Sequence, residues 1–204
     1  MTPRRSDGRK LVVGLSGASG LVYGLRLLDN IRFARVLYGR VFVVYTDNAA
    51  KIARLEEGVD LVSHLRGLEG VDGIYHSNDL SSPLASSSNL VSTDMVIAPA
   101  SMSTIARIAQ GVQDNLLTRV AAGVLRLGNK LVVVPRETPL STIDLRNLYL
   151  LSEAGAVVLP AMPAFYIKPK SVEDLVLFIV GKVFDALGVE HSLYPKWGEA
   201  SWSP

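Results

Sequence analysis

A glycine-rich turn that follows a short apolar run near the start of the chain restricts the folds open to it. Residues 11–15 form the apolar run, which has the composition of a buried parallel strand, and residues 16–20 form the turn. Leu21, Leu25 and Leu28 then share one stripe of a predicted helix. Small residues between a strand and a helix let backbone amides approach an anion, so the turn predicts a phosphate-binding loop. A tight structural connection is the alternative.

The spacing of the glycines argues against a dinucleotide. The dinucleotide fingerprint has glycine at its first, third and sixth positions, whereas the order here is Gly14, Gly17 and Gly20. Ser16 and Ser19 add hydroxyl groups to the turn. The sequence therefore predicts a mononucleotide rather than NAD.

The rest of the chain continues the alternation of short apolar runs and amphipathic segments. Strands are predicted at 11–15, 41–45, 73–76, 95–98, 130–134 and 156–159, and helices at 21–30, 48–57, 101–109, 115–127, 140–154 and 171–187. A Ser-rich stretch at 81–92 is predicted to be a loop. This alternation predicts an α/β fold of three layers, with a mostly parallel sheet between helices on both faces. We expect one domain at 10–187, a flexible tail at 1–9 and a C-terminal tail at 188–204.

The composition excludes several classes of site. The 204 residues contain no cysteine, which excludes disulfides and thiolate chemistry and is expected of an intracellular, cytoplasmic protein. Three scattered histidines predict no metal site, and a net charge of +2 lacks the electrostatic footprint of a nucleic-acid-binding protein. Hydrophobic residues make up 49% of the chain, but no apolar run reaches the ~18 residues of a membrane span. The excess of hydrophobic residues is expected to face partner subunits.

Polar residues gather where the predicted strands end. They are Ser16 to Ser19, Thr46, Ser101 to Thr104, Arg136 with Glu137, and Phe165 with Tyr166. Ligands of open parallel sheets bind at the carboxyl ends of the strands, so these clusters predict one shared site. Simple helix capping explains one hydroxyl of the 101–104 segment but not three. A surface salt bridge is the alternative for Arg136 and Glu137, and a solvated helix face is the alternative for Arg119 and Arg126.

Five motifs carry a resemblance to a known family. They are LVVGLSGASGLVYGLRLL at 11–28, PASMSTIA at 99–106, PRETPLS at 135–141, PAFYIKP at 163–169 and PKWGE at 195–199. In order and spacing they resemble the flavin prenyltransferases, the UbiX proteins and relatives once named phenylacrylic acid or 3-octaprenyl-4-hydroxybenzoate decarboxylases. The resemblance implies a flavodoxin-like or Rossmann-like subunit of a dodecamer that holds FMN between subunits.

The same resemblance implies the reaction. Members of the family join a dimethylallyl group from dimethylallyl monophosphate to N5 and C6 of reduced FMN without a metal. The product, prenylated FMN, serves a separate decarboxylase of the UbiD type. Whether this chain prefers a monophosphate or a diphosphate donor stays open.

The resemblance also assigns roles to individual residues. The expected FMN contacts are Gly17, Ala18, Ser19, Thr46, Ser101, Met102, Ser103, Thr104 and Arg136. The expected contacts of dimethylallyl phosphate are Ser87, Arg126, Arg136, Glu137, Tyr166 and Lys182. The expected catalytic residues are Ser19, Glu56, Arg119, Glu137 and Trp197.

The chemistry of the reaction suits these side chains. Cations placed before the reaction stabilise the departing phosphate, and an aromatic face shelters an allylic cation. Ser19, Glu56 and Glu137 are candidates for proton transfer, as is the departing phosphate itself. Arg126 and Lys182 stand where relatives carry lysine and arginine, and Asn89 follows a serine run that replaces a Ser-Gly-Ser loop. The departures at Arg126 and Lys182 keep the charge but change how phosphate is held, and the loss of the loop glycine is expected to change how the loop closes over the substrate.

Two other functions compete with this interpretation. The first is an FMN-dependent decarboxylase acting on cysteinyl peptides or phosphopantothenoylcysteine, a class that uses a histidine in an early helix and a PxMNxxMW segment. This chain has neither in the corresponding region. The second is a flavin carrier without enzymatic activity, which a test of product formation distinguishes.

Overall fold

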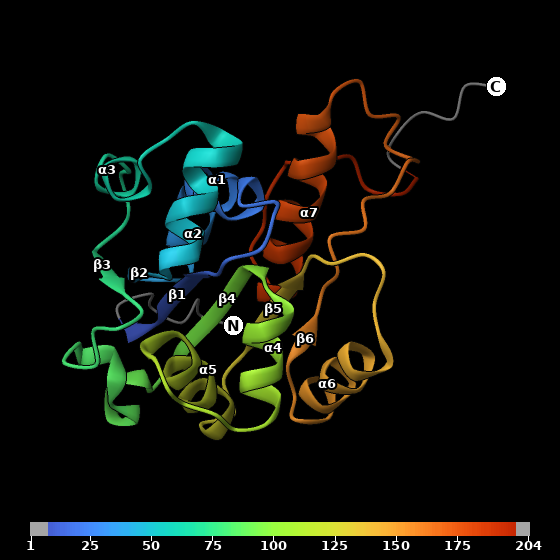
Figure 1. Cartoon of the computed structure of the whole chain (residues 1–204). Helices are drawn as coiled ribbons and strands as arrows, with labels where there is room; N and C mark the ends of the chain where they lie inside the picture. Colours follow the sequence, from blue (N-terminus) through green and yellow to red (C-terminus); the bar gives the residue numbers. More distant parts are fainter. Residues whose placement is uncertain (1–7, 199–204) are drawn as a thin grey trace, which may run out of the picture.

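Six parallel strands form one sheet in the computed structural model, which describes residues 8–198 (Figure 1). They are β1 (Lys10–Leu15), β2 (Arg40–Tyr45), β3 (Gly73–His76), β4 (Thr93–Ala100), β5 (Leu131–Pro135) and β6 (Val157–Val158). Their order across the sheet is β3-β2-β1-β4-β5-β6. The chain therefore changes direction across the sheet between β1 and β4, which makes the loops after these two strands neighbours.

Helices cover both faces of the sheet. One face carries α1 (Val22–Asp29), η2 (Ile31–Val36), α2 (Asp47–Ile52), η3 (Ala53–Glu57), α3 (Leu61–Arg66) and α7 (Val172–Leu187). The other carries η4 (Pro83–Ala85), η5 (Ser87–Leu90), α4 (Met102–Ala109), α5 (Leu116–Arg126) and α6 (Thr142–Glu153). The predicted three-layer, flavodoxin-like α/β fold is confirmed.

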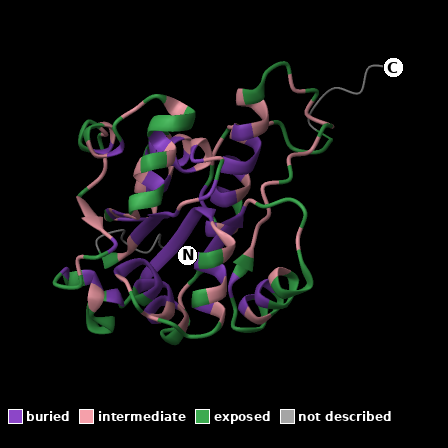
Figure 2. Ribbon diagram, in the orientation of Figure 1, coloured by how far each residue is buried: buried purple, intermediate pink, exposed green. Residues whose placement is uncertain are grey.

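Each strand supplies side chains to two hydrophobic cores. In β1, Leu11, Val13 and Leu15 point into the core beneath α1 and α7, whereas Val12 points into the core beneath α5. Successive side chains of a strand point to opposite faces, and both faces here are covered. Figure 2 shows the resulting buried sheet between two layers of half-exposed helices.

The structure differs from the predicted elements in three places. The helices η2 and α3 were not predicted, because six residues are too few to show a helical period. The Ser-rich loop contains two short 3-10 helices, η4 and η5. The prediction that the fourth strand ends at Ala98 is wrong, because β4 continues through Pro99 to Ala100. An irregularity in its pairing with β5 between Ile97 and Ala100 accommodates the proline.

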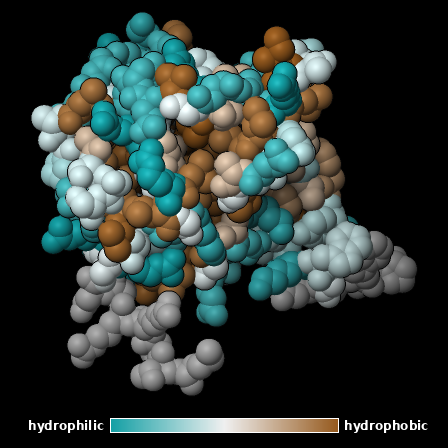
Figure 3. Space-filling model, turned by 90° about the horizontal axis from the view of Figure 1, so that it is seen from below, coloured by the Kyte–Doolittle hydropathy of each residue, from teal (hydrophilic) through white to brown (hydrophobic). Residues whose placement is uncertain are grey.

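Some large hydrophobic side chains lie on the surface. Val36, Leu55, Ile143, Met162, Phe165 and Val172 are each more than 70% exposed. Figure 3 shows one face of the molecule, on which hydrophobic side chains gather between hydrophilic ones. No helix within residues 8–198 is long and apolar enough to cross a membrane. Residues 1–7 of the predicted N-terminal tail and residues 199–204 of the C-terminal tail, including the last residue of the PKWGE motif, lie outside the described residues.

Candidate functional site

A buried serine joins the loops that follow β1 and β4. The Ser16 hydroxyl donates to the carbonyl oxygen of Pro99 at 2.9 Å and accepts from the backbone amide of Ser101 at 2.8 Å. Ser16 is 0% exposed, so its hydroxyl is used inside the protein. The expectation that Ser16 offers a hydroxyl to a ligand is therefore wrong. Ser16 instead fixes the glycine-rich turn against the start of α4.

A cavity of about 460 Å³ opens beside this junction. Five of the residues predicted to contact FMN line it: Gly17, Thr46, Ser101, Ser103 and Thr104. A Cβ at Gly17 would lie 2.3 Å from the Cβ of Asn48, so only glycine lets the turn approach α2 this closely. Backbone and hydroxyl groups thus form part of the wall of the cavity, beside the charged residues Asp47, Lys51 and Arg107, and such groups suit a phosphate and a polyhydroxyl chain.

Some of the hydroxyl groups that line this cavity also cap helices. Thr46 accepts from the amide of Ala49, and Ser101 accepts from the amide of Thr104 at 3.2 Å. The Ser103 hydroxyl instead contacts the guanidinium of Arg107. Capping therefore accounts for Thr46 and Ser101, and the Thr104 hydroxyl accepts from the Ser101 hydroxyl at 3.0 Å, so all four hydroxyl groups have a partner inside the protein.

A second group of predicted residues meets at the same edge of the sheet. Arg136, which follows β5, donates from Nε to the carbonyl oxygen of Ser19 at 2.9 Å. Glu56, in η3, accepts from the amide of Gly20 at 2.8 Å. Burial acts to raise the pKa of Glu56, but hydrogen bonds from Ser19, Gly20 and Leu21 and the charge of Arg136 lower that pKa below its usual value. Ser19, Glu56 and Arg136 therefore form one cluster with an ionised carboxylate.

Arg136 and Glu137 lie side by side without pairing. Both line a small cavity of about 80 Å³, and Glu137 accepts from the amide of Thr138 at 3.0 Å. No ion pair joins Arg136 to Glu137 among the residues that the structure describes, so the salt-bridge alternative is wrong. Both side chains remain available to a ligand.

Aromatic rings connect three further predicted residues beside α7. The ring of Tyr166 lies 5.0 Å from that of Trp197 and 6.0 Å from that of Phe178, measured between centroids. The Nζ of Lys182 lies 5.7 Å from the centre of the Phe178 ring and 3.3 Å from a carboxylate oxygen of Asp185. Tyr166, Trp197 and Lys182 thus belong to one aromatic and cationic cluster. Trp197 is 67% exposed, so it lies at the surface of this cluster.

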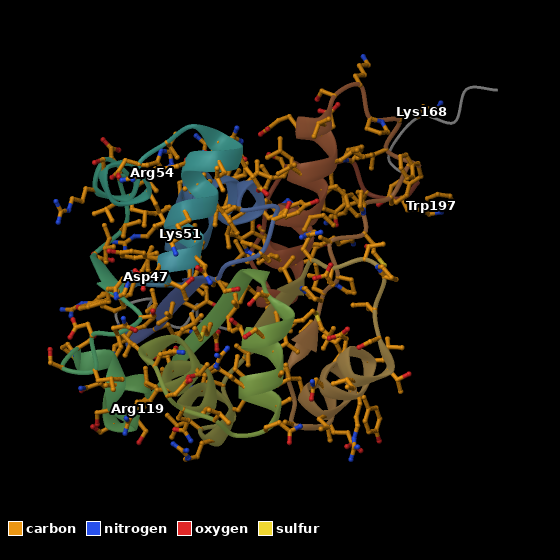
Figure 4. All side chains as sticks on the ribbon, viewed as in Figure 1. Asp47, Lys51, Arg54, Arg119, Lys168 and Trp197 are labelled. Carbon is orange, nitrogen blue, oxygen red and sulfur yellow. The ribbon has the colours of Figure 1, made fainter. Side chains whose placement is uncertain are left out.

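The remaining predicted residues line another cavity, of about 600 Å³. Ser87 of η5 faces Arg119 and Arg126 of α5 across it, with Ser81 and Ser86 in the same wall. Neither arginine forms an ion pair within residues 8–198. Figure 4 shows Arg119 on α5 and Trp197 beside α7, on opposite sides of the chain. One chain therefore does not bring Ser87, Arg119 and Arg126 together with Tyr166, Trp197 and Lys182.

Several residues of the first cavity were not predicted from the sequence. Ser77 directly follows β3, so the rule applied to the other strand ends would have found it. Asn115 caps α5 by accepting from the amide of Thr118 at 3.1 Å, and a capping pattern gave no reason to expect a ligand nearby. Lys51 and Arg107 lie within helices, where the sequence alone does not show which loop they face. Within residues 8–198 no three His, Cys, Asp or Glu side chains gather as a metal site would require.

The known sequences and solved structures that are most informative for this chain indicate one family. Residues 1–184 match the family model described as Flavoprotein. A protein of Thermoplasma acidophilum named flavin prenyltransferase UbiX is 43% identical over 188 residues, which cover 92% of this chain and 99% of that protein. AnUbiX (PadA1), solved in complex with FMN and dimethylallyl pyrophosphate, is 36% identical with a TM-score of 0.85 and covers 93% of this chain and 97% of its own. A dodecameric FMN-dependent Ubix-like decarboxylase from Escherichia coli O157:H7 is 36% identical with a TM-score of 0.85, over 92% of this chain and 98% of that one.

The cysteine decarboxylases are more distant. The FMN-dependent cysteine decarboxylase TvaF is 23% identical, with a TM-score of 0.58, over 74% of this chain and 88% of that one. That similarity is one of fold alone. The comparisons do not favour the decarboxylase alternative.

Proposed function

Since this chain belongs to the Flavoprotein family and, within it, to the UbiX flavin prenyltransferases, we propose that it joins a dimethylallyl group from dimethylallyl monophosphate to reduced FMN. The observation that carries the proposal is the meeting of Ser19, Glu56 and Arg136 at the sheet edge that also holds the cavity lined by Gly17, Thr46 and the 101–104 segment. The flavin supplies the two atoms that accept the prenyl group, N5 and C6. The residues described above bind, orient and exchange protons around it.

Backbone groups, hydroxyl groups and Arg136 are assigned to the flavin end of the proposed site. Gly17, Thr46, Ser103 and Thr104 line the cavity, and we assign Ala18, Ser19, Ser101, Met102 and Arg136 to the same ligand. Backbone and hydroxyl groups hold a phosphate without a large change of charge on binding. The Arg136 guanidinium, oriented by the Ser19 carbonyl, is left with donors that point away from Nε and can fork onto an anion.

The prenyl phosphate is assigned to arginine and lysine side chains, together with polar side chains, from two separate parts of the fold. Arg136, Glu137, Tyr166 and Lys182 supply one part, and Ser87, Arg119 and Arg126 supply another. These cations stabilise the negative charge that develops on phosphate as the allylic C–O bond breaks. Trp197, edge-on to Tyr166, is assigned to shelter the allylic carbon from water.

The separation of these two groups supports an assembly of several copies. A complete site would need residues of neighbouring subunits, and large exposed hydrophobic side chains are available for contacts between copies. The Escherichia coli relative described above is dodecameric, and we infer a homododecamer for this chain as well. The segment after residue 187 is assigned to closing the site, because it brings Trp197 to Tyr166.

Proton transfer is assigned to the cluster at the first turn. Closing the ring at C6 releases a proton there, and the prenyl double bond takes one up. Glu56 is ionised and hydrogen-bonded to the turn, so it accepts a proton while Ser19 relays it. Glu137 and the departing phosphate are the other candidates. The product is expected to leave for a UbiD-type decarboxylase in the cytoplasm.

Product formation tests the proposal directly. Purified protein is incubated without oxygen with reduced FMN and dimethylallyl monophosphate, and the flavin is analysed by mass spectrometry. A flavin heavier by one five-carbon unit is the expected result. Unchanged FMN that remains bound would support the flavin carrier instead, and oxidative decarboxylation of a peptide ending in cysteine would support the decarboxylase alternative.

A further inference from the structure

A lysine without a partner lines the cavity assigned to the flavin. Lys51 is part of α2, and its side chain borders the same space as Gly17, Ser103 and Thr104. Among residues 8–198, Lys51 forms no hydrogen bond or ion pair. Its ammonium group is therefore free to meet an anion that enters the cavity.

The other charged residues of this cavity already have partners. Arg107 donates from Nε to a carboxylate oxygen of Asp114 at 3.2 Å and also contacts Ser103. Asp47 lies 3.0 Å from Nε2 of His76. Lys51 is thus the cation of the described cavity lining whose charge no carboxylate offsets.

We propose that Lys51 is the counter-charge of the flavin phosphate and gives the site its preference for FMN over riboflavin. The inference rests on the proposed function, because it requires a flavin in this cavity. Hydroxyl and amide donors hydrogen-bond to a phosphate and also to a neutral alcohol, whereas the full positive charge of a lysine ammonium adds an attraction that only the charged ligand experiences. Lys51 therefore distinguishes FMN, which carries a charged phosphate, from riboflavin, which does not.

Arg54 provides a matched control on the same helical face. Figure 4 shows Asp47, Lys51 and Arg54 following one another along α2 and η3. Arg54 does not border the flavin cavity in the described structure, but lines a neighbouring one of about 430 Å³ with Asp47, Ala50 and Lys51. Its guanidinium is bound to Asp60 at 2.7 Å. Removing Arg54 changes the charge of the surface without removing the proposed phosphate partner.

The test compares binding of two flavins by fluorescence titration. FMN and riboflavin are titrated into the wild-type protein and into the variants Lys51→Met, Lys51→Arg and Arg54→Met, at low and high salt. We expect Lys51→Met to weaken FMN binding about tenfold, the loss of one charge-assisted contact, and to leave riboflavin binding unchanged. Lys51→Arg should retain most of the FMN affinity, and Arg54→Met should match the wild type. The preference for FMN should also shrink as salt rises in the wild type but not in Lys51→Met.

Two results would overturn the inference. The first is FMN binding by Lys51→Met within twofold of the wild type, and the second is an equal loss for FMN and riboflavin, which would mean that Lys51 supports the cavity as a whole. Failure of the wild-type protein to bind either flavin is a different result, because it would contradict the proposed function itself.

Discussion

At the scale of single residues, the two serines of the first turn have different tasks. Ser16 is buried and joins two loops, whereas Ser19 is exposed and lies beside Glu56 and Arg136. The sequence placed both in a ligand-binding turn, because a hydroxyl near a glycine looks the same whether it faces a cavity or the interior. Only the position of Pro99 on the neighbouring strand decides which serine is structural.

Ser16→Ala should destabilise the fold. The substitution leaves the Ser101 amide without its acceptor and leaves the Pro99 carbonyl with only the backbone amide of residue 16 at 3.3 Å, which costs about 1–3 kcal/mol of the free energy of unfolding. Urea denaturation of the variant measures this loss. Ser19→Ala is the matched control, and equal stability of the two variants would show that the Ser16 bonds contribute nothing.

Glu56→Gln should retain flavin binding while turnover falls. The hydrogen bonds from the first turn and the charge of Arg136 overcome burial and hold the pKa of Glu56 below its usual value, so the carboxylate is ionised at neutral pH and the amide cannot replace it as a proton acceptor. The rate of product formation and the flavin Kd are measured together. Glu57→Gln serves as the control on the adjacent residue, and an unchanged rate in Glu56→Gln would remove Glu56 from the mechanism.

At the scale of elements, α7 anchors the C-terminal segment through one carboxylate. Asp185 contacts the Tyr194 hydroxyl, Nε2 of His191 at 3.1 Å and Nζ of Lys182 at 3.3 Å. His191 is only 2% exposed, so the segment is packed closely where it leaves the helix. The Asp185 network therefore positions the chain that carries Trp197 to Tyr166.

This network should make stability depend on pH in the acid range. Burial acts to raise the pKa of Asp185, but hydrogen bonds from Tyr194, His191 and Lys182 lower that pKa below its usual value. A carboxyl with a lowered pKa stabilises the fold above its unfolded pKa, and that contribution is lost as pH falls through the folded pKa. Asp185→Asn should therefore lose stability at neutral pH and show a shallower decline on acidification, measured by urea unfolding across the carboxylate range. Glu190→Gln, outside the network, should keep the wild-type slope, and a wild-type slope in Asp185→Asn would contradict the prediction.

The sequence predicted the long elements better than the short ones. The helix α5 shows a clear helical period of buried residues, and β1 is a continuous buried run that faces both cores, so both can be recognised in the sequence. The helix α3 buries only Leu61 and Leu65, and its start depends on Asp60 accepting from the amide of Ser63 at 3.0 Å. Tertiary contacts determine whether such a short segment forms a helix, and these contacts leave no pattern in the local sequence.

At the scale of the whole molecule, the candidate site divides into parts that the sequence treated as one. The strand-end rule predicted the group at Ser19 and Arg136 because both follow parallel strands of one sheet. The same rule says nothing about Arg119 and Trp197, which lie on a helix and in the C-terminal segment. In the proposed assembly their meeting would depend on how copies pack together, which a rule about the strands of one sheet does not address.

Mixing two inactive variants tests whether the site is shared between copies. Arg119→Met and Tyr166→Phe each remove a side chain from a different part of the site, so each alone should be slow. Oligomers assembled from both, by co-expression or by refolding together, should regain part of the activity where one copy supplies Arg119 and its neighbour supplies Tyr166. Mixed oligomers no more active than the separate variants, with mixing confirmed by mass spectrometry, would place both residues in one copy's site.

The strands at the two borders of the sheet are short. The strand β6 has two residues and β3 has four, so each border exposes few unpaired backbone amides and carbonyls. Sheet borders of this kind are poor templates for the runaway strand pairing that leads to aggregation. The short borders therefore limit pairing between the sheets of separate copies, even though hydrophobic residues make up 49% of the chain.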